Sequence, residues 1–264
     1  MELLPTFSNN KSTLYQQQQQ QQQQQTRFKR SSPMPLIITR LVRFTQMDFE
    51  FALWQMAYLL LAPRRVYRNI YYHKQTKNQW ARDDPAFLVL LASLLCVSAI
   101  AWGLVFGLGF LGVVKAMLLM VLVDFVLVGS IVATLLWFFT NRFLNQSNAI
   151  TQTHDQKVEW AYAFDIHCNS FFPLFLILYI IQFCFLNLLI RHNWASLVIS
   201  NAIYLISIVW YCYGTFLGFN VLPFLVHTEL LLYPIFGFLV LFIVLCVLGI
   251  NLSENVVGLY FGWS

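Results

Sequence analysis

Few residues in this chain have side chains suited to chemistry, and the first is a single acid in an apolar stretch. Asp124 is the only acidic or basic residue well inside such a segment, which covers residues 116–140. A charge at that depth costs at least ~2.5 kcal/mol, so Asp124 should face other helices or stay protonated. One interpretation is a proton or substrate site. The favoured one is a structural acid hydrogen-bonded to a neighbour such as Gln182, Asn187 or Tyr204, because no second intramembrane acid or base forms a relay with it.

The second set of reactive residues lies in the sequence VEWAYAFDIHCNSFFP. It contains Glu159, Asp165, His167 and Cys168, and the aspartate and histidine suggest metal binding or acid–base catalysis. A catalytic zinc site needs three protein ligands, and a cysteine–histidine pair needs a defined orienting group. Only His154 lies nearby to complete either set. We therefore expect no catalytic residue, no metal and no cofactor here, and we interpret the motif as structural.

A basic, tyrosine-rich run extends from Arg64 to Arg82 and contains no acidic residue. Its six cations are Arg64, Arg65, Arg68, Lys74, Lys77 and Arg82. A basic segment directly before a membrane span can bind anionic lipid, and it helps to set the orientation of the span. Alternating basic and aromatic residues also suit single-stranded RNA, but no RRM, KH or zinc-knuckle signature accompanies them. The run predicts a surface for a protein partner or for an anionic cytosolic leaflet.

Composition identifies the class of protein that must position these residues. The chain has 264 residues, of which 59% are hydrophobic and 10% charged, with a mean hydropathy of +0.63. A soluble domain carries about 25% charged residues, so a polytopic membrane protein is indicated. The five cysteines form no C-x-x-C motif, which argues against a zinc ribbon or a redox pair.

Five apolar segments, each about the 20 residues that a bilayer core needs, predict an all-α fold with five transmembrane helices. The segments cover residues 86–110, 116–140, 171–190, 195–219 and 231–250. Very short links join the first to the second and the third to the fourth, so these should form hairpins. The link 141–170 is the one sizeable loop, and residues 251–264 form a short tail.

Two short helices at the membrane surface are predicted before the first span. Thr45 and Asp48 match a capping box in front of an apolar run that stops at Pro63. That run is too short to span a bilayer and suits an interfacial helix. Pro63 is well placed to begin the second helix, whereas Asp84 should cap the first span with Pro85 at its first position.

The N-terminal region divides into a tail and a juxtamembrane segment. Residues 1–44 are polar and include the unbroken glutamine run Gln16–Gln25, which predicts a disordered tail. Residues 45–85 form the juxtamembrane helical segment.

The distribution of lysine and arginine predicts the orientation of the chain. Twelve of the 16 precede residue 86, and Arg142 and Lys157 fall in the long loop on the same side. The opposite side holds only Lys115 and Arg191. The positive-inside rule therefore predicts a cytosolic N-terminus and a lumenal C-terminus, which agrees with an odd number of spans.

Three motifs resemble the Unc-fifty family of Golgi membrane proteins. They are MDFEFALWQM, VYRNIYYHKQTKNQWARDDPAFLVL and VEWAYAFDIHCNSFFP, and the resemblance runs from about Leu41 to the C-terminus. It implies residence in Golgi and early secretory membranes and support for vesicular trafficking of membrane cargo, including assembled ligand-gated receptors. The yeast relative is linked to exchange factors for Arf GTPases, which implies such a factor as a partner.

The hypothesis that follows is a non-enzymatic trafficking adaptor with a partner-binding surface in Asp48–Arg82 and the loop 141–170. The first alternative is an RNA-binding protein of the nuclear envelope. The second is a small transporter or lipid-handling protein that uses Asp124. The endoplasmic reticulum and the inner nuclear membrane are the alternative locations.

Overall fold

The structure is a computed structural model, and helices make up most of the part of the chain that it describes. This part consists of residues 47–69, 80–82, 84–145 and 157–262, and it contains no strand. A bilayer offers no partners to backbone N–H and C=O groups, so an apolar chain satisfies them internally as helices. The predicted all-α fold is confirmed, whereas the predicted disordered tail lies outside the described residues.

Five helices are long and apolar enough to cross a membrane, as predicted. The first is α5 (Ala86–Val105) and the fourth is α10 (Trp194–Asn220). The second combines α6 (Phe110–Leu118), η2 (Leu119–Leu127), α7 (Val128–Phe139) and η3 (Thr140–Leu144). The third combines α8 (Trp160–Phe175), η4 (Leu176–Ile181) and α9 (Gln182–Leu189), and the fifth combines η5 (Thr228–Leu232) and α11 (Pro234–Leu248). The segments η2 and η4 are π-helical.

The second and third spans are longer than predicted. They cover Phe110–Leu144 and Trp160–Leu189, so most of the predicted loop 141–170 outside residues 146–156 is helical. The prediction counted the residues that cross a hydrocarbon core, whereas helix ends depend on local caps and packing. As a result, the sequence WAYAFDIHCNSFFP is the first part of a span, and residues 146–156 lie outside the described part.

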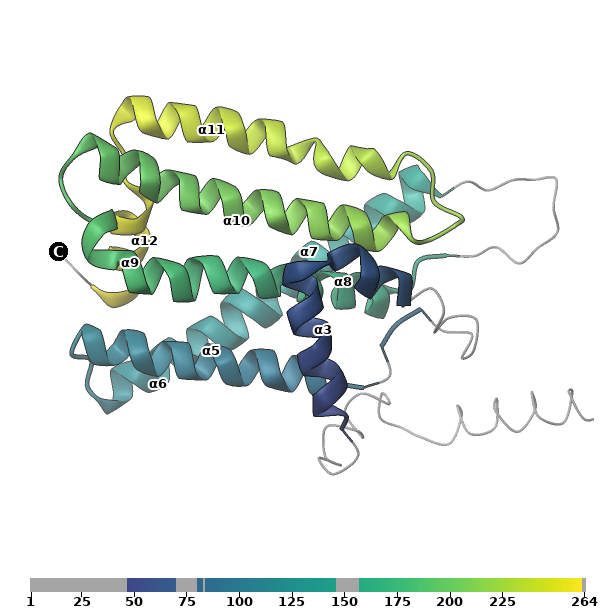
Figure 1. Ribbon diagram of the computed structural model, residues 1–264, viewed down its shortest axis with the longest axis horizontal. Helices are drawn as coiled ribbons and strands as arrows, with labels where there is room; N and C mark the ends of the chain where they lie inside the picture. The colour runs from purple at the N-terminus through teal and green to yellow at the C-terminus, as the bar shows by residue number, and fades with distance from the viewer. Residues whose placement is uncertain (1–46, 70–79, 83, 146–156, 263–264) are drawn as a thin grey trace, which may run out of the picture. The chain divides into compact units, whose positions relative to one another are not determined.

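Helices are present at both positions predicted before the first span, with one change of cap. Helix α3 (Phe49–Leu61) begins after Asp48, whose carboxylate accepts a hydrogen bond from the Phe51 backbone N–H at 2.9 Å. Asp48 is therefore the N-cap, and Thr45 lies outside the described residues. Pro63 begins a second helical stretch that covers residues 63–69. Helix α3 contacts α5 and α8 and runs crosswise to the long helices (Figure 1).

Asp84 joins the starts of two helices. One carboxylate oxygen accepts from the Asp48 backbone N–H at 2.7 Å, and the other accepts from the Ala86 backbone N–H at 3.0 Å. The capping role predicted for Asp84 is thus present, although the helix begins at Ala86, one residue later than predicted, with Pro85 at the N-cap position. The same acid fixes α3 to the entrance of the first span.

Small residues let α8 contact its neighbours closely. A Cβ added to Gly218 of α10 would lie 2.8 Å from Ile166, and one added to Gly129 of α7 would lie 2.3 Å from the His167 ring. Helices can approach this closely only where side chains are small. These glycines therefore serve packing within the chain, since α8 contacts both α7 and α10.

The C-terminal segment folds back on the bundle. Helix α11 ends at Gly249, whose φ of 72° suits glycine, and α12 (Leu252–Phe261) then contacts α9 and α10. Asn251 is only 7% exposed, caps α12 and donates a hydrogen bond to the Leu189 carbonyl at 2.7 Å. The short tail of the prediction is thus largely an ordered helix.

Candidate functional site

The three motifs that resemble a known family meet at one buried residue, Asn169 of α8. Its side-chain oxygen accepts hydrogen bonds from Arg82 Nη2 at 2.6 Å and from Gln55 Nε2 at 3.5 Å. Asp165, one turn earlier, accepts from the Arg82 backbone N–H at 2.5 Å. Asn169 is 1% exposed and Gln55 is also buried. Segments more than 80 residues apart in the sequence are therefore held together by polar contacts inside the protein.

Arg82 is half-buried and donates to this cluster, so this member of the predicted basic surface also has contacts inside the protein. Its guanidinium carbon lies 4.4 Å from the centroid of the Phe87 ring, at the start of α5. A guanidinium can stack on an aromatic face while it donates hydrogen bonds in its own plane. Arg82 thus links α5 to α8, because its guanidinium stacks on the Phe87 ring and donates to the Asn169 side chain.

Three donors around this cluster have no hydrogen-bond partner among the described residues. They are the Tyr67 hydroxyl, Arg82 Nη1 and Asn169 Nδ2. Burial raises the pKa of the Tyr67 hydroxyl above its ordinary value, although nearby Ser170, Arg82 and Asn169 oppose this shift. The Tyr67 hydroxyl therefore stays protonated.

The other basic residues divide into an exposed set and a set outside the described part. Arg64, Arg65 and Arg68 are exposed on the helical stretch 63–69. The opposite face of that stretch is held in the protein, because Val66 is 2% exposed and Tyr67 is 1% exposed. Lys74 and Lys77 lie outside the described residues. Three of the six cations predicted to form the basic surface, Arg64, Arg65 and Arg68, are therefore exposed at defined positions.

These three arginines point in two directions. Arg65 lies over the Tyr58 ring at 4.8 Å and donates to the Tyr58 hydroxyl at 3.2 Å. Arg64 instead donates from Nε to the Tyr213 hydroxyl at 3.3 Å. Arg64 and Arg68 line a groove of about 510 Å³ against the end of α10, and Arg65 does not. Arg64 and Arg68 therefore face the groove, whereas Arg65 on the same helix packs against Tyr58.

Asp124 lies in a second polar site, in the middle part of the second span. Its carboxylate accepts hydrogen bonds from the Tyr179 hydroxyl at 2.8 Å and the Tyr260 hydroxyl at 2.5 Å. Asp124 belongs to η2 and Tyr179 to η4, and π-helical segments often occur at functional sites. The partners differ from the three that the sequence suggested, since Gln182 instead donates to Tyr204 at 3.1 Å.

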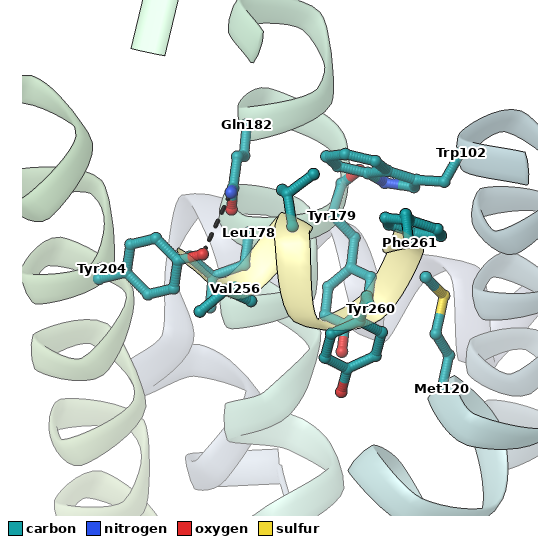
Figure 2. Close-up of a pocket in the computed structure, with 10 residues that line it drawn as sticks. Trp102, Met120, Leu178, Tyr179, Gln182, Tyr204, Val256, Tyr260 and Phe261 are labelled. Carbon is teal, nitrogen blue, oxygen red and sulfur yellow. Dashed lines mark hydrogen bonds between the residues drawn. The ribbon is translucent and has the colours of Figure 1, made fainter. Parts of the chain in front are cut away.

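Tyr179 and Tyr260 border a cavity of about 90 Å³. Figure 2 shows their hydroxyl groups close together, and the pair formed by Gln182 and Tyr204 on another side of the cavity. Phe261 completes the wall by stacking on Trp102, with ring centroids 5.4 Å apart. Helix α12 therefore contacts the bundle through the Tyr260 hydroxyl and through the Phe261 ring.

His167 is buried, and His154, the residue that the sequence suggested as its companion, lies outside the described residues. Its Nδ1 lies 2.8 Å from the Tyr211 hydroxyl, and its ring packs against Phe125 and Phe171. In the described part of the chain, no three His, Cys, Asp or Glu residues are placed to hold a metal ion. His167 instead fills the space that Gly129 leaves on α7.

Sequence reasoning did not identify Asn169, Tyr179 or Tyr260 as members of polar sites. Asn169 carried a usable signal, because it follows Asp165 by one helical turn and so shares its face. Tyr179 and Tyr260 carried none, because the acid that they share is distant from both of them in the sequence.

Comparison with known proteins agrees with the motifs. The model of the UNC-50 family matches residues 37–261, which leaves out the glutamine run. A protein unc-50 homolog of Rattus norvegicus is 44% identical over 259 residues and 98% of each chain. That of Dictyostelium discoideum is 47% identical over 240 residues, which are 90% of this chain and 91% of the relative. That of Homo sapiens is 47% identical over 224 residues, which are 84% and 85% of the two chains.

No solved structure matches the chain. The five apolar helices identify a multi-pass membrane protein. The matched residues include all three motifs and the segments that meet at Asn169. This chain belongs to the UNC-50 family.

Proposed function

We propose that this protein is a non-enzymatic adaptor of Golgi and early secretory membranes. In this role it supports vesicular trafficking and the cell-surface delivery of membrane cargo such as ligand-gated receptors. It does so by holding a soluble regulator, an exchange factor for Arf GTPases, at the membrane. The charge asymmetry of the sequence supports a cytosolic position for the basic end of the chain.

The observation that carries this proposal is the fixed placement of Arg64, Arg65 and Arg68. They are exposed on one short helix whose other face is buried. A positively charged surface of defined shape can select a partner and raise its rate of association, because charge complementarity steers the encounter. A solvated tail with the same charges would lack a defined shape.

A triple substitution tests the adaptor function. In cells that lack the endogenous protein, Arg64/Arg65/Arg68→Gln should reduce the exchange factor on Golgi membranes and slow cargo export. The variant itself should keep its level and location, because these side chains lie outside the core. Fractionation with quantitative blotting measures all three quantities.

Arg191→Gln is the matched control, since it removes an exposed arginine that follows α9, away from this helix. Recruitment and export should stay normal in this control. Normal recruitment and export in a stable, correctly located triple variant would rule out this surface as the adaptor site.

A second candidate function, transport or lipid handling at Asp124, is favoured by the cavity beside Tyr179 and Tyr260. Uptake or lipid scrambling by the purified protein in liposomes tests it. RNA binding by the basic run is tested by crosslinking in intact cells.

A further inference from the structure

The groove beside Arg64 and Arg68 has the features of a binding site for one lipid molecule. It lies between the helical stretch 63–69 and the C-terminal end of α10, and its volume is about 510 Å³. Helix α10 is long and apolar enough to span a membrane, so we expect its end to lie near the membrane surface. Phospholipid headgroups should therefore be close to the mouth of this groove.

The polar side of the groove offers donors. Arg64 and Arg68 are one helical turn apart and exposed, and none of the lining residues is acidic. Asn220 also lines the groove, and its side-chain oxygen accepts from the Thr228 hydroxyl at 2.9 Å, which leaves its NH₂ group as a donor. Guanidinium groups bind phosphate oxygens through paired hydrogen bonds, so this arrangement suits a phosphate.

The opposite side of the groove is apolar. Phe216, Leu217 and Val221 line it along the last turns of α10. An acyl chain or a glycerol backbone could lie against these side chains while the phosphate stays between the arginines. A free phosphate ion would use only the polar side.

We propose that this groove binds the headgroup of an anionic glycerophospholipid. The phosphate lies between Arg64 and Arg68, and the attached glycerol and acyl carbons lie against Leu217 and Val221. The site does not depend on the recruitment of a soluble factor. It also differs from the general attraction of a basic surface for a charged leaflet, because Arg65 on the same helix is outside it.

Photocrosslinking in proteoliposomes tests this site with purified full-length protein and no other protein. The probe is a phosphatidic acid that carries a photoreactive group near the glycerol, diluted in phosphatidylcholine. Crosslinks should map to Phe216–Val221. The double variant Arg64/Arg68→Gln should lower their yield about 25-fold, since each of the two cations contributes about a factor of five.

Two further variants separate a specific site from diffuse attraction and from misfolding. Arg65→Gln removes the same charge from the same helix and should keep nearly the full yield. Val221→Trp fills the groove without any change of charge and should lower the yield, while the variant keeps the elution profile and melting temperature of the native protein. An equal loss in Arg65→Gln, or an unchanged yield in a folded Arg64/Arg68→Gln variant, would overturn the proposal.

The source of the phosphate is tested in the same vesicles. A phosphatidylcholine probe with the same photoreactive group should crosslink to Phe216–Val221 much less than the anionic probe. Millimolar inorganic phosphate should leave the anionic crosslink intact. Equal labelling by the neutral probe, or displacement by inorganic phosphate, would show that the groove does not select an anionic lipid.

Discussion

Tyr260 donates a hydrogen bond of 2.5 Å to Asp124, which lies 136 residues earlier in the chain. The tyrosine is near the end of α12, and the acid lies in the second span. Tyr179 supplies a second donor to the same carboxylate from the third span. The C-terminal helix is thereby tied to two spans through one acid.

We predict that Asp124→Asn keeps the fold, because an amide oxygen can still accept from both tyrosines. Asp124→Leu should lower folded yield, since it leaves two hydroxyls without an acceptor at about 1–3 kcal/mol each. Size-exclusion yield and melting temperature in detergent measure the difference. Loss of trafficking in a well-folded, correctly located Asn variant would instead support a transport role for Asp124.

A second prediction concerns the contact between Gly129 and His167. Gly129→Ala should destabilise the protein by about 1–3 kcal/mol, because the added Cβ would lie 2.3 Å from the imidazole. The matched control is Gly237→Ala in α11, where no atom lies within 4 Å of the added Cβ. Thermal unfolding in detergent should show a lower midpoint only for Gly129→Ala. Equal midpoints for the two variants would show that α7 and α8 do not approach this closely.

The gross fold could be predicted from the sequence, because long apolar segments have few other solutions in a membrane. The start of α8 could not. Asp165, His167 and Asn169 made this segment resemble a polar loop, yet each has a polar contact inside the protein. Those contacts come from Arg82 and Tyr211, which are distant in the sequence. Helical periodicity indicates local structure, but it does not indicate which distant residue will form a hydrogen bond with a buried polar group.

The third prediction compares two arginines that both stack on aromatic rings. Arg82 lies 4.4 Å from the Phe87 centroid and Arg65 lies 4.8 Å from the Tyr58 centroid. Arg82 in addition donates to buried Asn169, so Arg82→Gln should cost about 2 kcal/mol or more. Arg65→Gln should cost less than about 1 kcal/mol, because its site is exposed. Urea or thermal unfolding of both variants in the same detergent gives the comparison, and similar costs would show that Arg82 is not structural.

The last prediction is the orientation of the chain in the membrane. Five spans place the two ends on opposite sides, and the excess of lysine and arginine before residue 86 predicts that the N-terminus is cytosolic. A protease added to sealed microsomes should therefore remove an N-terminal tag and spare a C-terminal one. Detergent should expose the protected tag, which controls for sealing. Protection of both tags, or loss of both, would mean that one of the five apolar helices does not cross.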